Sequence, residues 1–167
     1  MLLYRDALSG DELFSDAFPM KEVADFFYEV DCKMITVGGD NIDIGANPSA
    51  EDGEEIMEDG VETVNNVVHS FRLTTTSFDK KSYMSYIKGY MKAIGKHISE
   101  KNPERLAAFQ ELAKVHVKNI ITNFSDYDFY VGESMDPEGM VALLNYREDG
   151  VTPFFTFFKD GLKAEKL

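Results

Sequence analysis

Cysteine and histidine side chains, which could act as a nucleophile and its base, are few in this sequence. The chain has one cysteine, Cys32, and three histidines, His69, His97 and His116. A nucleophile needs an adjacent base, and the sequence gives no reason for any of these histidines to lie near Cys32. The Gly-x-Ser-x-Gly and Cys-x-x-Cys motifs are also missing. Cys32 lies in an alternating apolar pattern, which favours a buried structural thiol, and we expect no catalytic residue.

Carboxylates are abundant, so calcium must be considered. Acidic residues crowd together between residues 38 and 62, where the chain has no Lys or Arg. Their spacing does not fit an EF-hand, whose oxygen ligands occupy fixed positions around a central Gly and end in a bidentate Glu. Two interpretations stay open, a solvated acidic loop and a loop that gathers Ca²⁺ weakly without a rigid cage. The candidates for weak calcium association are Glu51, Asp52, Glu54 and Glu55.

The sequence gives little indication of a metal site made of cysteines or histidines. One cysteine excludes a structural zinc site made of four thiolates. His97 and His116 fall on predicted helices, where lone histidines usually pack or face solvent. We therefore expect no cofactor other than weakly bound Ca²⁺.

Basic residues concentrate in a different part of the chain. Between residues 80 and 118 there are nine Lys or Arg and three Glu, although the whole chain has a net charge of −13. Such segregation produces a dipolar molecule whose basic helix face can bind acidic partners, including the acidic tails of tubulin. The alternative is that these lysines are ordinary solvated side chains. The candidate partner-binding residues are Lys80, Lys81, Lys88, Lys92 and Lys96.

The overall charge excludes some partner classes. An acidic surface repels phosphate backbones and anionic lipid headgroups, so we expect no binding to nucleic acid. No stretch approaches the roughly 20 apolar residues that a membrane span needs, and we find no signal peptide. A single cysteine fits a reducing compartment. These observations predict a cytoplasmic protein.

Strand patterns occupy both ends of the chain. Within residues 1–37, Tyr28, Val30 and Cys32 alternate with acidic residues, and Met34–Val37 continues extended to a Gly-Gly turn. The alternation from Val67 to Leu73 also predicts a strand.

Three further strands are predicted toward the C-terminus, at Tyr127–Val131, Met140–Tyr146 and Pro153–Lys159. The last two are joined across Arg147–Gly150, which contains an Asp-Gly turn.

Two amphipathic helices are predicted between these groups of strands. Apolar residues from Tyr83 to Ile98 recur at helical spacing. Asn102 as N-cap and Pro103 at the first position predict the start of a second helix. Because the helices form one block amid strands, the fold class is α+β with a mainly antiparallel sheet. We expect one domain, residues 1–167, with a mobile acidic loop at 38–63 and a helical hairpin at 79–124.

Two stretches resemble the signature sequences of the translationally controlled tumour protein family. The first is Ile42–Glu51 (IDIGANPSAE), and the second lies within Phe124–Tyr146 and includes FYVGE and EGMVA. Shorter blocks such as Tyr86–Lys92 (YIKGYMK) and Asn145–Pro153 (NYREDGVTP) agree too, in order along the whole chain. The run Gly38–Glu51 resembles that of fungal members.

The resemblance implies a β-tent core with a projecting helical hairpin and a long acidic loop. It implies links to protein synthesis through ribosomes and elongation-factor complexes, to tubulin and microtubules, and to calcium binding. The family's tubulin-binding segment corresponds to Lys80–Lys101, which implies association with the cytoskeleton. Glu12 and Glu133 match positions placed near a contact with Ras-like small GTPases.

Three hypotheses about function therefore remain. The first is a non-enzymatic interaction protein of the cytoplasm linked to protein synthesis and microtubules, with weak calcium binding. The second is an exchange factor or dissociation-inhibiting factor for a Ras-like GTPase. The third is a low-affinity calcium buffer.

Overall fold

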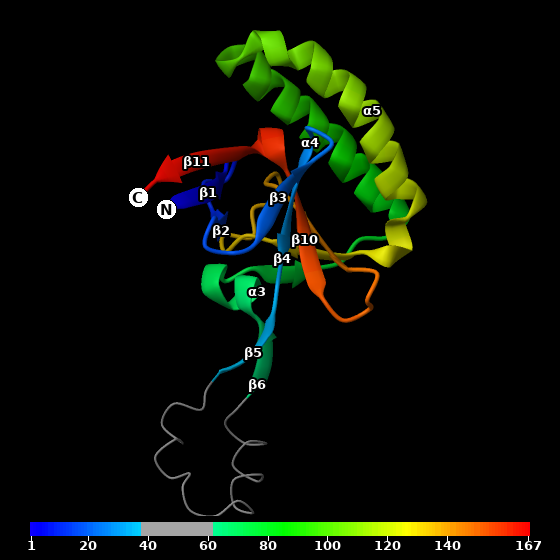
Figure 1. The fold of residues 1–167 in the computed structure, drawn as a ribbon. Coiled ribbons are helices and arrows are strands. Elements are labelled where there is room, and N and C mark those ends of the chain that lie inside the picture. The colour runs from blue at the N-terminus through cyan, green and yellow to red at the C-terminus, as the bar shows by residue number, and fades with distance from the viewer. Residues whose placement is uncertain (38–61) are drawn as a thin grey trace, which may run out of the picture.

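The computed structural model describes residues 1–37 and 62–167 (Figure 1). The strands in these ranges are β1 (Leu2–Asp6), β2 (Glu12–Ser15), β3 (Met20–Val23), β4 (Phe27–Asp31), β5 (Met34–Val37), β6 (Glu62–Asn65), β7 (Thr74–Thr76), β8 (Asp128–Val131), β9 (Ala142–Tyr146), β10 (Pro153–Phe158) and β11 (Leu162–Lys166). The α-helices are α3 (Asn66–Phe71), α4 (Lys80–Lys101) and α5 (Leu106–Thr122). Short 3₁₀ turns are η1 (Pro103–Arg105), η2 (Phe124–Asp126) and η3 (Lys159–Gly161).

The described strands form three sheets in which neighbouring strands run antiparallel. The largest has the order β3-β4-β10-β9-β8-β7, a smaller one has the order β11-β1-β2, and β5 pairs with β6. Figure 1 shows α4 and α5 side by side at one end of the molecule and the β5–β6 ribbon at the other. The predicted α+β class, the mainly antiparallel sheet and the helical hairpin are confirmed.

Phenylalanines of β10 form the centre of the core. Phe155, Phe157 and Phe158 are at most 1% exposed. The ring of Phe157 stacks on Phe14 of β2 at 4.5 Å, and Phe158 contacts Tyr90 of α4 at 5.6 Å. Because β10 is covered by the small sheet on one face and the hairpin on the other, it reads as a nearly continuous apolar run.

The strand predicted from Val67 to Leu73 is wrong, because this segment contains helix α3. The side-chain oxygen of Asn65 accepts hydrogen bonds from the backbone N–H groups of Val67 (2.9 Å) and Val68 (3.2 Å). This cap satisfies donors that a helix start leaves unpaired. The helix ends at Arg72, whose φ of 56° is left-handed. Periodicity in so short a segment does not separate helix from strand.

The first helix of the hairpin begins as its sequence indicates. Asp79 accepts a hydrogen bond from the Ser82 backbone N–H (2.7 Å), and the Ser82 hydroxyl accepts one from the Asp79 N–H (3.1 Å). This reciprocal pair is a capping box. The residues of α4 that are buried lie three or four apart and pack into the core: Tyr83, Ile87, Tyr90, Ile94 and Ile98.

The second helix begins differently from the prediction. Pro103 opens the 3₁₀ turn η1, and α5 starts only at Leu106. Asn102 occupies the predicted N-cap position, but it precedes the 3₁₀ turn and its side chain makes no capping hydrogen bond. Pro103 nevertheless occupies a first helical position, where its missing N–H has no cost.

Arg105 ties the tip of the hairpin to the sheets. Its guanidinium donates two hydrogen bonds to the Asp160 carboxylate, at 3.0 and 2.8 Å, and a third to Asp25 at 2.6 Å. The side chains of Arg105 and Asp160 are only 15% and 11% exposed. The hydrogen bonds to Asp160 are the main reason that the pKa of Arg105 rises above its usual value. Lys159 also binds Asp25, at 2.7 Å.

The final strand was not expected from the sequence. β11 pairs with β1 in an antiparallel register from Leu2 opposite Lys166 to Asp6 opposite Leu162. Most of its side chains are exposed, and the alternation of Leu162 and Ala164 with charged residues is too short to predict a strand.

The predicted acidic loop at 38–63 lies almost entirely outside the described residues. Glu62 and Thr63, which were included in that loop, instead belong to β6.

Candidate functional site

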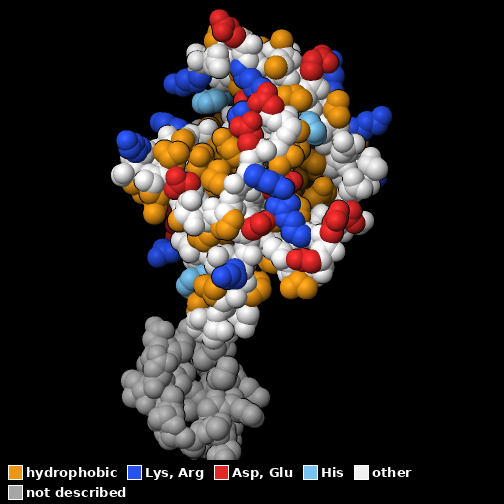
Figure 2. Space-filling view, in the orientation of Figure 1, with side chains coloured by type: hydrophobic (Ala, Val, Ile, Leu, Met, Phe, Trp, Pro, Cys, Tyr) orange, Lys and Arg blue, Asp and Glu red, His pale blue; other side chains and the backbone are white. Residues whose placement is uncertain are grey.

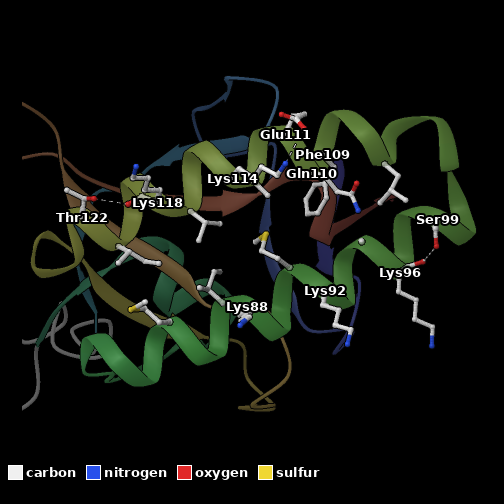
Figure 3. A pocket seen from close by; sticks show the side chains of 18 residues that line it. Lys88, Lys92, Lys96, Ser99, Phe109, Gln110, Glu111, Lys114, Lys118 and Thr122 are labelled. Atoms are coloured by element: carbon white, nitrogen blue, oxygen red, sulfur yellow. Dashed lines mark hydrogen bonds and ion pairs between the residues drawn. The ribbon is translucent and has the colours of Figure 1, made fainter.

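The hairpin has a second apolar surface besides the one buried against the sheets. A groove of about 1150 Å³ runs between α4 and α5. Its deepest apolar residues are Ile87 and Phe109, each 2% exposed, and the Phe109 ring lies between the two helices in Figure 3. The apolar side chains nearer to solvent are Met84, Met91, Leu106, Ala113, Val117 and Ile121.

Lysines flank this groove on both helices. Lys88, Lys92 and Lys96 contribute to it from α4, and Lys114 and Lys118 contribute from α5. Residues four apart lie on one face of a helix, so each set forms a row. In Figure 3, Lys92 and Lys96 extend from α4 on the side away from α5. The apolar groove is therefore bordered by positive charge.

Most of these lysines are not neutralised by the described residues. Glu111 is the one acidic residue that lines the groove, and it lies 3.4 Å from the Lys114 ammonium. The structure gives no ion pair to Lys88, Lys92, Lys96 or Lys118 within residues 1–37 and 62–167. Within these two ranges their charges are therefore not paired with a carboxylate.

The five predicted partner-binding lysines do not form one group. Lys88, Lys92 and Lys96 line the groove, whereas Lys80 and Lys81 lie in the first turn of α4 and do not. Lys114 and Lys118 were missing from the predicted set. Their signal in the sequence is that they directly follow Ala113 and Val117 of the apolar row, at the same spacing of four residues.

Glu12 and Glu133 come together in a second, polar cleft of about 390 Å³. Glu133 pairs with Arg72 at 3.0 Å, and Glu12 lies 3.6 Å from Arg5. The two glutamate side chains are 59% and 50% exposed. Because exposed ion pairs are weak, a partner can displace these arginines at little cost.

Asp11 holds the two sides of this cleft together. Its carboxylate accepts a hydrogen bond from the Ser134 hydroxyl at 2.7 Å. The backbone of Gly132 lies so close to Asp11 that any β-carbon there would overlap the Asp11 side chain. The sequence contains Asp11 next to Glu12, but nothing in it indicates a bond across 123 residues.

The structure supports the structural role predicted for Cys32. Its side chain is buried, and burial raises the thiol pKa to about 11. The thiol is therefore protonated at neutral pH and a poor nucleophile. His116 packs in an aromatic cluster, stacked on Phe26 at 5.2 Å. His69 belongs to α3 and not to the predicted strand.

The predicted calcium candidates Glu51, Asp52, Glu54 and Glu55 lie outside the described residues. In the part of the chain that the structure covers, no group of three His, Cys, Asp or Glu side chains could hold a metal ion.

The described residues are much less acidic than the whole chain. Eight acidic residues and no basic residue fall between positions 38 and 61, so residues 1–37 and 62–167 carry −5 of the total −13. Figure 2 shows acidic and basic side chains interspersed over the face it presents. The face shown, drawn from the described residues, is therefore not a uniformly acidic surface.

Helix α4 is long but charged. None of the helices in residues 1–37 and 62–167 combines the length and apolar character that crossing a bilayer requires.

Comparisons with known proteins agree with this fold. A family model described as translationally controlled tumour protein matches residues 1–163. The homologue from Schizosaccharomyces pombe is 67% identical over 169 residues, and that from Saccharomyces cerevisiae is 57% identical over 167 residues, with 100% of both chains covered in each case.

Two solved structures of similar proteins have the same fold. The translationally controlled tumor-associated protein of Schizosaccharomyces pombe matches with a TM-score of 0.84 and 65% identity, covering 100% of both chains. The translationally-controlled tumor protein of Caenorhabditis elegans matches with a TM-score of 0.73 and 32% identity, covering 100% of this chain and 99% of the other. The chain therefore belongs to the translationally controlled tumour protein family.

Proposed function

We propose that this protein is a non-enzymatic interaction protein that binds acidic segments of other proteins through its helical hairpin. One observation carries the proposal: an apolar groove between α4 and α5 is bordered by five lysines, four of which have no ion pair among the described residues. Exposed apolar surface of this kind marks binding sites, and lysines without an opposite charge nearby attract an acidic partner.

The family resemblance supplies the cellular setting of this proposal. It supports cytoplasmic partners in protein synthesis, namely ribosome and elongation-factor complexes, and association with tubulin and microtubules. Weak Ca²⁺ association is part of the proposal and rests on the density of carboxylates in residues 38–62 of the sequence.

Reversing two groove lysines should weaken microtubule binding. We expect Lys88→Glu/Lys92→Glu to reduce the association constant about tenfold at low salt, because each reversal replaces an attraction to the acidic tubulin tails by a repulsion. Co-sedimentation with microtubules at increasing protein concentration measures the change.

The matched control is Lys80→Glu/Lys81→Glu, which changes the net charge equally but lies outside the groove. This pair should retain binding within about threefold of the wild type. Equal losses in both variants would indicate a response to net charge alone, and unchanged binding in both would refute the hairpin as the binding face.

A second candidate function, regulation of a Ras-like GTPase, is favoured by the cleft that contains Glu12 and Glu133. Both carboxylates are exposed on one concave surface and their arginine partners are displaceable. A GTPase side chain such as a lysine could replace either arginine. This arrangement suits a contact that alters nucleotide release in the partner.

Glu12→Val should abolish any effect of this protein on nucleotide release from a Ras-like GTPase, measured by stopped-flow fluorescence. Glu165→Val is the control, because Glu165 pairs with the same Arg5 at 3.4 Å but does not line the cleft. It should behave like the wild type. A wild-type protein that leaves the release rate at background would eliminate this function.

A further inference from the structure

We infer that the groove between α4 and α5 binds a single amphipathic α-helix with acidic flanks, supplied by a partner protein. This inference rests on the proposed function and deepens it, because it specifies the shape of the acidic partner. An extended acidic tail and an acidic amphipathic helix both neutralise lysines, but only the helix also covers apolar surface.

The shape of the groove suits a helix. Two antiparallel helices, α4 and α5, form its walls, and a third helix laid between them would complete a packing unit of three helices. The 17 residues of α5 set a length of about 25 Å, which matches a partner helix of four to five turns. Helix binding in an apolar groove is a general mode of recognition, with anchor residues on one face of the ligand helix.

Apolar surface runs along the length of the groove. On α4, Met84 is 47% exposed and Met91 is half-buried, and on α5 Val117 and Ile121 are half-buried. A helix with large apolar residues three and four apart would bury these side chains. Methionine has a flexible, polarizable side chain and adapts to differently shaped anchors.

The lysines select the sign of charge on the ligand. Lys88, Lys92 and Lys96 follow one side of the groove, and Lys114 and Lys118 follow the other. A ligand helix with Glu or Asp on both sides of its apolar face would meet both rows. A second copy of this hairpin is a poor occupant, because residues 80–118 carry six more positive than negative charges and would repel each other.

The test uses a synthetic peptide of about 18 residues, with Leu at helical spacing on one face and Glu on both flanks. Fluorescence anisotropy gives its Kd, and amide chemical shifts of the labelled full-length protein locate its site. We expect shifts on α4 and α5 around the groove. A scrambled peptide of identical composition and a Glu→Lys peptide should each bind at least about tenfold more weakly.

A variant that fills the groove completes the test. Ala113→Trp should reduce peptide affinity about tenfold, because Ala113 lies in the groove and is half-buried. Val115→Trp is the matched control, since Val115 is 57% exposed and does not line the groove. Thermal unfolding of both variants verifies that they remain folded.

Different failures lead to different conclusions. Equal binding of the scrambled peptide, or shifts outside the groove, would overturn the helix inference. The inference would also be overturned if sedimentation showed that the protein forms dimers and that the peptide dissociates them. That result would assign the groove to a second copy of the chain. If the peptide fails while Lys88→Glu/Lys92→Glu still weakens microtubule binding, the proposed function survives without a helical ligand.

Discussion

Replacing Arg105 with alanine should lower the free energy of unfolding by about 3 kcal/mol, the largest effect we expect from a single substitution. The guanidinium of Arg105 makes two hydrogen bonds to Asp160, and both side chains are mostly buried. Without Arg105 the Asp160 carboxylate keeps its desolvation cost and loses the charge that offsets it. Urea unfolding followed by circular dichroism measures the loss.

Arg72→Ala is the control for this prediction. Arg72 also forms an arginine–carboxylate pair, with Glu133 at 3.0 Å, but the two side chains are 77% and 59% exposed. An exposed pair contributes less than about 1 kcal/mol. Similar losses for Arg72→Ala and Arg105→Ala would contradict the role that we assign to burial.

The second large effect is expected at Gly161. Any β-carbon at this position would overlap the Tyr90 hydroxyl and come within 2.8 Å of the Met140 methyl group. Tyr90 and Met140 are 3% and 2% exposed, so neither side chain can relieve the overlap by turning into solvent without leaving the core. Gly161→Ala should therefore destabilise the protein by about 2 kcal/mol through overpacking. The shift in urea midpoint at an unchanged m-value gives its size.

Tyr90→Phe offers a rescue that isolates this mechanism. Among the described residues the Tyr90 hydroxyl is buried and has no hydrogen-bond partner, so its removal should be neutral or slightly stabilising. The double variant Gly161→Ala/Tyr90→Phe should recover about half of the loss. Strictly additive effects would show that the overlap with the hydroxyl is not the cause.

Long periodic segments made the hairpin and the C-terminal strands predictable. The apolar residues of α4 repeat over more than four turns, and the Asp79–Ser82 cap marks its start. β10 is read from a nearly unbroken apolar run, and the Asp-Gly turn before it ends at Gly150, whose φ is 72°. In these segments the secondary-structure propensity of the local sequence and the burial of its apolar residues favour the same structure.

The features that sequence reasoning missed depend on contacts between distant residues. Helix α3 is too short for the spacing of its apolar residues to distinguish helix from strand. Its helical structure depends on the cap that Asn65 provides. β11 is recognised only by its pairing with β1. The Arg105–Asp160 pair joins residues 55 apart, and no local pattern indicates it.

The candidate sites were predictable to different degrees. The spacing of Lys88, Lys92 and Lys96 identified the row of lysines on α4. The groove beside them could not be predicted, because it depends on how α5 packs against α4. Glu12 and Glu133 were connected only through the family resemblance, and the structure brings them into one cleft. The clamp between Asp11 and Ser134 that shapes this cleft spans 123 residues.

The pairing of β1 with β11 has a consequence for synthesis of the chain. β1 is synthesised before the segment that contains its partner β11, because Leu2 pairs with Lys166 and Asp6 pairs with Leu162. Until then one edge of β1 is unpaired, and unpaired strand edges are prone to associate with other chains. Formation of the β11-β1-β2 sheet must therefore wait until the segments between β1 and β11 have been made, and it closes the long loop between Asp6 and Leu162, a pairing of the distant kind that forms slowly.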